Sequence, residues 1–276
     1  MPQQTEPDVT TRFDHCAPAQ VRRVAAMLDL DPELQRPGQP LPRGWHFFLM
    51  GGDTRRSQLR ADGFPGLGVT MPDLGLPRLL LAGRSVVWTG DLAVGDQIER
   101  RSQLEDVTEK TGPSGRFAFV TLRHTLRPLS QAQPALTETQ TYALLPAAPA
   151  SARVAKRAES PAAAHQRRIT PDETLLFQYS ALGFNSHMIH LDREYARTIE
   201  GLPDLVVNGG LTTLLATEFL RTELNAVPAA LRARHLAPLY CNRPLTILAD
   251  PVTAGWRLRV LDDSGTLSAE LEVDIA

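Results

Sequence analysis

The sequence predicts an α+β protein made of two halves, each of which combines a helix with an antiparallel sheet. Several segments alternate apolar and polar residues with the period of two that is typical of strands. One segment in the second half repeats its apolar residues with the period of a helix. Between the halves, residues 146–168 are rich in Ala, Pro and Arg and almost lack large apolar side chains. This composition indicates a linker, which divides the chain into an N-terminal half at 1–145 and a C-terminal half at 169–276.

The N-terminal half is expected to contain one short helix followed by antiparallel strands. The helix is expected at 21–30, where the sequence reads VRRVAAMLDL. Residues 116–126 alternate between two faces, and the Thr-Gly-Pro-Ser-Gly run at 111–115 before them is typical of a hairpin turn. The expected strands cover residues 84–89, 97–109, 116–126 and 137–144.

The C-terminal half contains the clearest helix of the sequence. Its apolar residues lie at i, i+3, i+4 and i+8, on one side of a helix from about 210 to 224. Two strands follow at 256–261 and 267–275, and the turn at 262–265 joins them. One apolar face and one charged face suit a sheet that wraps around one buried helix. The apolar residues of the helix are Leu211, Leu214, Leu215 and Phe219.

Composition and charge exclude several classes of protein. The chain has 276 residues, of which 42% are apolar, so it can bury the core of one large or two small domains. A formal charge of -2 argues against nucleic acid and against electrostatic docking on membranes. No apolar run approaches the roughly 18 residues that a membrane helix needs. The polar N-terminus resembles no signal peptide, and Cys16 and Cys241 make no disulfide framework, so we expect a cytoplasmic protein.

The densest polar cluster within an apolar region lies at 184–192, which reads FNSHMIHLD, and a short helix is expected after it at 193–196. The longer run at 179–196, YSALGFNSHMIHLDREYA, resembles the signature of the MaoC-like hydratases and dehydratases. These are hot-dog enzymes that add water to enoyl thioesters. The pattern FNSHxIHxD is most similar to a subgroup that includes mesaconyl-C4-CoA and itaconyl-CoA hydratases and type 2 hydroxyacyl-thioester dehydratases.

Weaker similarities extend the resemblance from about Trp45 to the end of the chain. They comprise the segments 76–83, 94–96 and 110–115, and the segment 237–240, which resembles an APLF strand of the subgroup. The resemblance implies a double hot-dog fold, in which an antiparallel sheet wraps around a central helix in each half. It also implies a hydro-lyase that acts on a coenzyme A thioester, with a catalytic C-terminal half and a degenerate N-terminal copy.

The resemblance implies that His190 and Asn185 are the catalytic residues. Imidazole has a reference pKa of ~6.5, so His190 can accept a proton from water and return one to carbon near neutral pH. The amide of Asn185, where the hydratase motif has Asp, can hold water but cannot accept its proton. Gly209 and Gly210 open the expected helix, where free backbone N–H groups can hold the thioester oxyanion. The matching glycine of the family follows a His, whereas Asn208 stands at that position here.

Each of these residues also has an ordinary structural interpretation. His190 can be a core histidine whose ring nitrogens are satisfied. Asn185 can be a turn residue, which is the usual role of Asn. Gly209 and Gly210 can form a simple turn into the helix. These interpretations stay open for Asn185 and for the glycine pair, whereas the nine-residue match favours a catalytic role for His190.

Some residues near the motif and the expected strands have the chemistry for metal binding or carboxylate binding. His187 and His190 are three residues apart with Asp192 nearby, but no Cys pair or third His accompanies them, so we expect no metal and no cofactor. Arg78 and Arg84 can grip a substrate carboxylate, but single arginines next to strands usually have structural roles.

Four functions remain in competition. The first is hydration of a short dicarboxylyl thioester such as itaconyl-CoA or mesaconyl-CoA, which a buried Arg at the floor of the pocket would favour. The second is a 3-hydroxyacyl-carrier-protein dehydratase of fatty acid or polyketide synthesis, which needs a long apolar acyl channel. The third is a non-catalytic acyl-thioester-binding subunit. The fourth, a thioesterase, is disfavoured because residues 211–213 offer no carboxylate. By analogy of fold, hot-dog sheets pair edge to edge, so a homodimer is expected.

Overall fold

The computed structural model describes residues 9–112, 115–147 and 162–275. Its described residues form one antiparallel sheet of ten strands. In chain order these are β1 (Val9–His15), β2 (Arg78–Trp88), β3 (Gln97–Gly112), β4 (Gly115–Pro128), β5 (Leu136–Leu145), β6 (His165–Ile169), β7 (Pro228–His235), β8 (Leu245–Val252), β9 (Gly255–Leu261) and β10 (Leu267–Ile275). Their spatial order is β1-β3-β4-β5-β2-β7-β10-β9-β8-β6.

The two halves of the chain share this sheet without mixing their strands. All strands of the N-terminal half lie on one side of the junction, and all strands of the C-terminal half lie on the other. The junction is the antiparallel pair of β2 and β7, in which Arg84 lies opposite Ala233. This pairing brings β2 side chains of the N-terminal half next to the C-terminal half.

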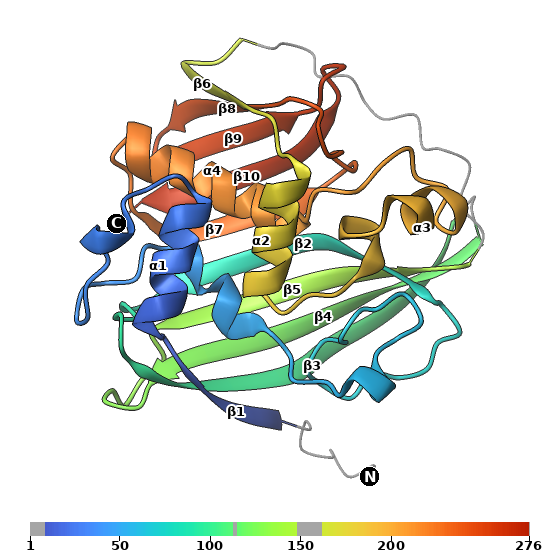
Figure 1. The fold of residues 1–276 in the computed structure, drawn as a ribbon, viewed down its shortest axis with the longest axis horizontal. Coiled ribbons are helices and arrows are strands. Elements are labelled where there is room, and N and C mark those ends of the chain that lie inside the picture. The colour runs from blue at the N-terminus through green and yellow to red at the C-terminus, as the bar shows by residue number, and fades with distance from the viewer. Residues whose placement is uncertain (1–8, 113–114, 148–161, 276) are drawn as a thin grey trace.

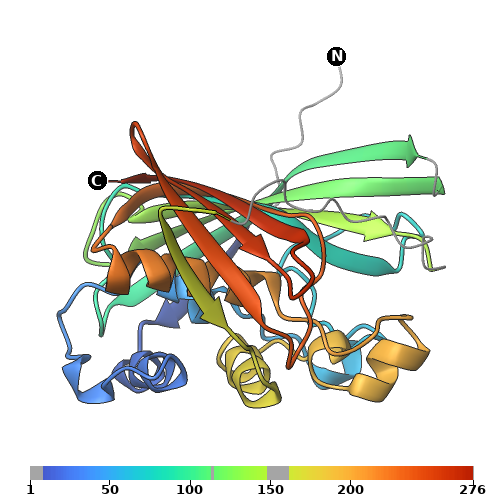
Figure 2. The same cartoon turned by 90° about the horizontal axis from the view of Figure 1, so that it is seen from above.

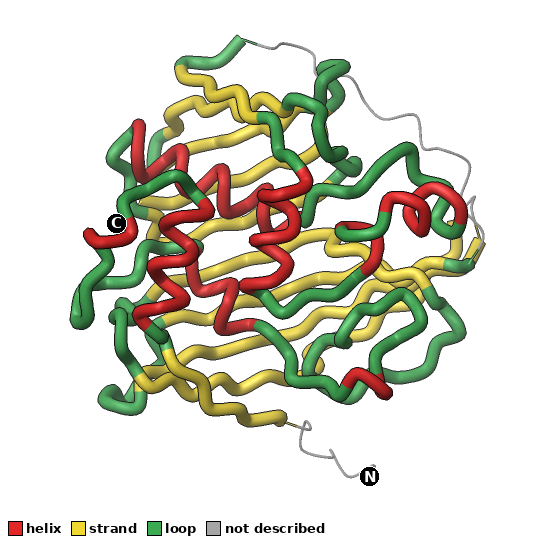
Figure 3. Tube along the Cα trace, viewed as in Figure 1, coloured by secondary structure: helices red, strands yellow, loops and turns green. Residues whose placement is uncertain are grey.

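The helices gather on one face of the sheet (Figures 1, 2 and 3). They are α1 (Pro18–Met27), α2 (Glu173–Leu182), α3 (Arg193–Thr198) and α4 (Gly209–Glu223), with short 3-10 segments η1 (Pro32–Leu34), η2 (Trp45–Met50), η3 (Arg56–Gln58) and η4 (Met188–His190). No helix of the described ranges is long and apolar enough to cross a membrane.

The α4 helix is the central helix of the C-terminal half. Its predicted apolar stripe is buried, but so are Thr212, Thr213, Thr217 and Glu218 on its other sides. It is buried all round because the sheet lies on one side of it and α1 and α2 lie on the other (Figure 1). The carboxylate of Glu218 stays satisfied, since it accepts a hydrogen bond of 2.7 Å from Trp45 Nε1 of the N-terminal half. One continuous sheet with a buried central helix agrees with the double hot-dog expectation, and α4 lies between the sheet and the outer helices.

Several expected bounds need correction. The helix expected at 21–30 is α1, which starts earlier because Pro18 suits a first helical turn and ends earlier because Asp29 has a positive φ of 58°. The segment 237–240 is no strand: Tyr240 makes only an isolated bridge, and Pro238 has no N–H to donate. The strands expected at 84–89, 97–109, 116–126, 137–144, 256–261 and 267–275 are present as β2, β3, β4, β5, β9 and β10.

The expected linker at 146–168 is described only at its ends. Residues 148–161 lie outside the described residues, as do residues 113–114 of the expected turn at 111–115. Residues 165–168 belong to β6, which pairs with β8. The sequence does not predict this edge strand, because it has no alternating apolar residues. Four of its five residues carry ionisable or amide side chains, and none is buried.

Candidate active site

A cavity of about 1120 Å³ lies between the two halves, at the N-terminal end of α4. All four residues that the sequence singles out, His190, Asn185, Gly209 and Gly210, line it. Residues of β2, β4 and β5 line it from the N-terminal half. The sequence prediction therefore names residues that meet in space.

His190 lies in η4 and is 8% exposed. Its Nδ1 lies 2.7 Å from the carbonyl oxygen of Val206. A carbonyl can only accept a hydrogen bond, so Nδ1 of the neutral ring carries the proton and Nε2 is left with its lone pair. Burial lowers the pKa of His190 to about 3, with a further contribution from His187, while the Val206 contact opposes the shift. The ring is therefore a neutral base over the whole physiological pH range.

The loop before His190 is shaped by short polar contacts. Phe184 has a positive φ of 48°, which ends α2 in a left-handed turn. The side-chain oxygen of Asn185 accepts a hydrogen bond of 3.1 Å from the backbone N–H of His187. Ser186 Oγ donates to the carbonyl oxygen of Gly63 over 2.6 Å. A side chain at Gly63 would overlap with the backbone of Ser186, so glycine is required for this close approach.

Asn185 therefore has the turn role that competed with its catalytic role. Only its oxygen is used in this way, and its residue still lines the cavity. His187 is buried and lies between two groups: its Nε2 is 3.7 Å from Asp62 Oδ2, and its ring centroid is 5.5 Å from that of His190. Burial lowers the pKa of His187 although Asp62 opposes the shift. His187 thus packs against the candidate base and supports its orientation.

The N-terminal end of α4 points free backbone donors at the cavity. The first intrahelical bond runs from Thr212 N to Asn208 O, so the N–H groups of Gly209 and Gly210 have no partner within the helix. No other acceptor for them occurs in the described part of the chain. A Cβ on Gly209 would lie 3.3 Å from the ring of His235, and a Cβ on Gly210 would overlap with Tyr179 Oη. Glycine is therefore required here by the close approach of protein side chains, and both glycines still line the cavity.

Asn208 stands where the resembled family has His. It is 3% exposed and caps no helix N–H with its side chain. Its Nδ2 lies 3.4 Å from Ser180 Oγ, and its Oδ1 has no partner among the described residues. The substitution keeps a buried polar group at the helix start but removes a titratable one.

The comparisons with known proteins agree with this geometry. Residues 44–241 match the family model of the hydroxyacyl-thioester dehydratases type 2. A mesaconyl-C(4)-CoA hydratase of Chloroflexus aurantiacus is 34% identical over 235 residues, which cover 83% of this chain and 82% of the relative. The chain belongs to the type 2 hydroxyacyl-thioester dehydratase family. It is an enzyme of the hydratase and dehydratase class that acts on acyl thioesters.

Solved structures of low sequence identity show the same fold as this dehydratase-family chain. A MaoC-like dehydratase from Phytophthora capsici has a TM-score of 0.73 at 11% identity, and the match covers 98% of this chain and 96% of that one. A Mycobacterium tuberculosis protein described as having a double hotdog fold has a TM-score of 0.60 at 15% identity, with 98% and 96% covered. Both likenesses extend over the two halves and not only over the motif.

Sequence reasoning missed several residues of the dehydratase cavity. Tyr179 stacks on Phe47 with ring centroids 4.4 Å apart, and His235 flanks Gly209. Arg84, for which the sequence allows either carboxylate binding or a structural role, lines the cavity from β2. Arg84 and His235 are far apart along the chain, and the pairing of β2 with β7 brings them together. Tyr179 belongs to the 179–196 run, but its stacking on Phe47 depends on the tertiary fold. Among the described residues, no group of three or more His, Cys, Asp and Glu side chains is placed to hold a metal ion.

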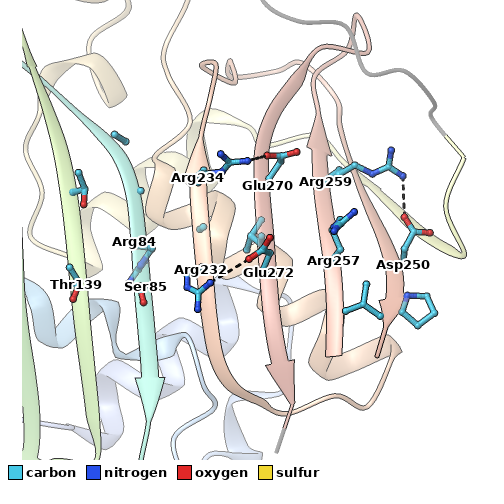
Figure 4. A pocket seen from close by; sticks show the side chains of 17 residues that line it. Arg84, Ser85, Thr139, Arg232, Arg234, Asp250, Arg257, Arg259, Glu270 and Glu272 are labelled. Atoms are coloured by element: carbon cyan, nitrogen blue, oxygen red, sulfur yellow. Dashed lines mark hydrogen bonds and ion pairs between the residues drawn. The ribbon is translucent and has the colours of Figure 1, made fainter. Parts of the chain in front are cut away.

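A second hollow lies on the opposite, outer face of the sheet (Figure 4). Six of its charged side chains pair across strands: Arg232 with Glu272 at 3.6 Å, Arg259 with Asp250 at 3.1 Å, and Arg234 with Glu270. None of the four predicted site residues lines it. The cavity at the start of α4 is therefore the candidate active site.

Proposed function

We propose that this enzyme adds water to the double bond of an enoyl-CoA thioester, and specifically to a short dicarboxylyl-CoA such as mesaconyl-CoA or itaconyl-CoA. The observation that carries the proposal is the neutral His190, whose Nε2 is free in the cavity that also holds the unbonded N–H groups of α4. The similarity to a mesaconyl-C(4)-CoA hydratase supports the choice of acyl group.

In the proposed reaction His190 acts as base and then as acid. As the water oxygen bonds to C3, Nε2 takes one proton of the water. The electron pair of the double bond moves towards the thioester, whose oxygen becomes an enolate oxygen. Gly209 and Gly210 donate hydrogen bonds to that oxygen, and preorganised donors of this kind stabilise charge that develops in the transition state. The proton on Nε2 then passes to C2 as the enolate collapses, so that H and OH have been added.

Asn185 has a supporting part in this scheme. Its oxygen is occupied by the His187 N–H, which leaves its NH₂ group to donate to the attacking water. An amide donor orients the lone pairs of water but removes no proton. Asn185 is therefore proposed as the water-positioning residue, and His190 as the only base.

The proposal extends to the organisation of the chain. The C-terminal half at 169–276 supplies His190, Asn185 and α4, the N-terminal half at 1–145 supplies the acyl pocket, and 146–168 joins them. A coenzyme A thioester is the proposed substrate, and the proposed assembly is a homodimer in the cytoplasm. Cys16 and Cys241 are both free and buried, which is compatible with a reducing compartment.

The decisive experiment is hydration by the His190→Gln variant. General base catalysis contributes about 10²- to 10⁴-fold, so kcat should fall by at least about 10²-fold while the fold is kept. His165→Gln, a change at an exposed histidine of β6, serves as the matched control and should keep full activity. Turnover of His190→Gln at the wild-type rate would show that another residue is the base.

The acyl group is decided by a panel of crotonyl, long-chain, itaconyl and mesaconyl thioesters. Preference for the dicarboxylyl compounds supports the proposal. Preference for a long-chain thioester on carrier protein points to a dehydratase of fatty acid or polyketide synthesis. Tight binding without turnover of any compound points to a non-catalytic acyl-binding subunit.

A further inference from the structure

The walls of the active-site cavity hold an excess of unpaired polar groups. Seven buried side-chain nitrogen or oxygen atoms lack a hydrogen-bond partner within the described ranges, and five of them belong to residues that line this cavity. Such groups are rare in native interiors and call for a physical explanation. The five residues are Arg84, Arg100, His124, Asn208 and His235. These unpaired atoms are themselves enclosed by protein, but the residues that carry them give the cavity a polar wall, which suits a polar acyl group better than a long hydrocarbon chain.

Arg84 is the cation that lies next to the proposed reaction centre. Its side chain is 6% exposed and comes from β2. One nitrogen, Nη2, donates to Glu138 Oε1 over 2.6 Å, and this contact fixes the guanidinium plane. The other terminal nitrogen, Nη1, lies 3.7 Å from the position of a Cβ on Gly210 and donates to no described residue. The guanidinium of Arg84 therefore binds Glu138 through Nη2, while Nη1 is free beside α4.

The two buried arginines of the cavity wall, Arg84 and Arg100, are compensated in different ways. The charge of Arg84 is matched by Glu138, which is fully buried and is also bound by His46 Nε2 at 2.7 Å. Arg100 is 3% exposed and donates only to the carbonyl oxygens of Leu49 and Gly51, without an ion pair among the described residues. Asp14 and Asp53 partly compensate the charge of Arg100 from a greater distance. What distinguishes Arg84 is therefore its free Nη1 beside α4, because a second anion can bind there while Glu138 keeps Nη2.

The position of Arg84 fits a short acyl group. With the thioester at the start of α4, the terminal carboxyl carbon of a four-carbon acyl group lies roughly 4 Å beyond the thioester carbon, from bond lengths of ~1.5 Å. Arg84 Nη1 is beside Gly210, at the reach of such a carboxylate and not of the end of a long chain. The α4 N-terminus adds a favourable field for an anion at the same place.

We propose that Arg84 is the specificity-determining residue of this enzyme and that it binds the free carboxylate of a short dicarboxylyl thioester. This inference rests on the proposed hydratase function. A different role competes with it: Arg84 Nη1 can instead donate to the thioester oxygen, together with the glycine N–H groups. The two roles differ in what happens to a substrate that has no carboxylate.

The test compares fumaryl-CoA with crotonyl-CoA, which differ only by a terminal carboxylate in place of a methyl group. Wild-type enzyme is expected to have the higher kcat/KM with fumaryl-CoA. Arg84→Met should lower kcat/KM for fumaryl-CoA by about 10- to 100-fold, the loss of a charged hydrogen bond, and crotonyl-CoA hydration by no more than about threefold. The matched control, Arg232→Met on the outer face of the sheet, should change neither rate.

Removing Arg84 alone leaves the buried carboxylate of Glu138 without its arginine partner, which can destabilise the fold. Two further variants therefore separate a loss of stability from a loss of substrate recognition. The double variant Arg84→Met/Glu138→Gln removes both charges and keeps a group for the Gln140 and His46 contacts of residue 138. It should show the same selective loss as Arg84→Met. Glu138→Gln alone frees the guanidinium from its ion pair and should keep or increase the preference for fumaryl-CoA.

The outcomes separate the inference from the proposed function. An equal loss with both thioesters assigns Arg84 to the thioester oxygen or to the fold and overturns the inference, while the hydratase function stands. A wild-type preference for crotonyl-CoA overturns it in the same way. If wild-type enzyme hydrates neither of these compounds nor any thioester of the panel above, the proposed function fails. Calorimetric binding of fumaryl-CoA and crotonyl-CoA to wild type and Arg84→Met then still decides whether Arg84 recognises the carboxylate.

Discussion

At the scale of single residues, one backbone carbonyl determines the chemistry of His190. The contact with Val206 O places the ring proton on Nδ1, and burial keeps the ring neutral. The sequence predicts His190 itself, since its spacing from Asn185 is part of a specific nine-residue motif. It cannot predict the tautomer, because Val206 is sixteen residues away along the chain and reaches the ring only in the folded protein.

Asn185 offers a test of how the neutral state of His190 is maintained. Asn185→Asp keeps an oxygen that accepts the His187 N–H, so the turn and the fold should persist. The new carboxylate adds negative charge near the ring, and an opposite charge favours the protonated form of an imidazole. The acid limb of kcat/KM, which starts from a His190 pKa of about 3, should move to higher pH.

The measurement is a pH–rate profile of hydration from about pH 8 down to about pH 2.5, with a shift of about half a pH unit or more expected from a nearby charge. Asn185→Ser is the neutral control, since its hydroxyl keeps an acceptor without adding charge. An acid limb that stays at its wild-type position in Asn185→Asp would contradict electrostatic coupling between residues 185 and 190.

At the scale of elements, the sequence predicts best the strands and the helix that have one apolar and one polar face. The strands β4, β9 and β10 alternate because one face packs on the core, and α4 has a clear apolar stripe. The edge strands β1 and β6 were missed because they bury little and read as polar segments. The strand β8 was missed because its central residues are buried on both faces and do not alternate.

The start of α4 depends on a close fit that the sequence motif does not reveal. Gly210→Ala places a methyl group onto Tyr179 Oη, and Tyr179 is held by stacking on Phe47. Overpacking of this kind costs about 1–3 kcal/mol, and the displaced helix start should also lose its donor geometry. We expect a lower midpoint in urea and a kcat reduced by about tenfold or more, in line with the loss of an oxyanion donor.

Tyr179→Phe in the same chain provides the internal control for the close fit. Removing Oη leaves the nearest remaining ring atom, Cζ, at 3.2 Å from the new Cβ, a tight contact that small shifts relieve. The double variant should therefore recover part of the stability and activity that Gly210→Ala loses. If Gly210→Ala is equally damaging with Tyr179→Phe, the effect comes from backbone conformation and not from the tyrosine.

At the scale of the whole molecule, the two halves have divided their roles within one continuous sheet. The C-terminal half presents His190 and α4, whereas the N-terminal half fills the cavity wall with Arg84, Arg100 and His124. The double hot-dog architecture follows from the motif and the resemblance. The polar interior of the N-terminal half does not, because its charged residues alternate along strands just as solvent-facing residues do.

This polar interior predicts how stability depends on pH. Burial lowers the pKa of His124 to about 4, of His235 to about 4 and of His190 to about 3. In the unfolded chain each histidine titrates near ~6.5, so below that pH the unfolded state binds more protons than the folded state. Stability is therefore fully present above pH ~6.5 and falls as the pH decreases towards these folded pKa values, by up to about 1.4 kcal/mol per pH unit for each histidine.

A substitution at His124 tests the contribution of one histidine to this dependence of stability on pH. Glu138 has its pKa lowered by Arg84 and His46 against the effect of burial, so its contribution is lost only at pH values below the usual range of Glu, ~4.3. Urea unfolding between pH 5 and 7 therefore reports mainly on the histidines. His124→Gln keeps a polar side chain at Ser102 but cannot titrate, so its free energy of unfolding should decline less steeply across this window than that of wild type. An unchanged slope would mean that His124 is already protonated in the folded protein. The cavity wall would then carry an additional positive charge at His124.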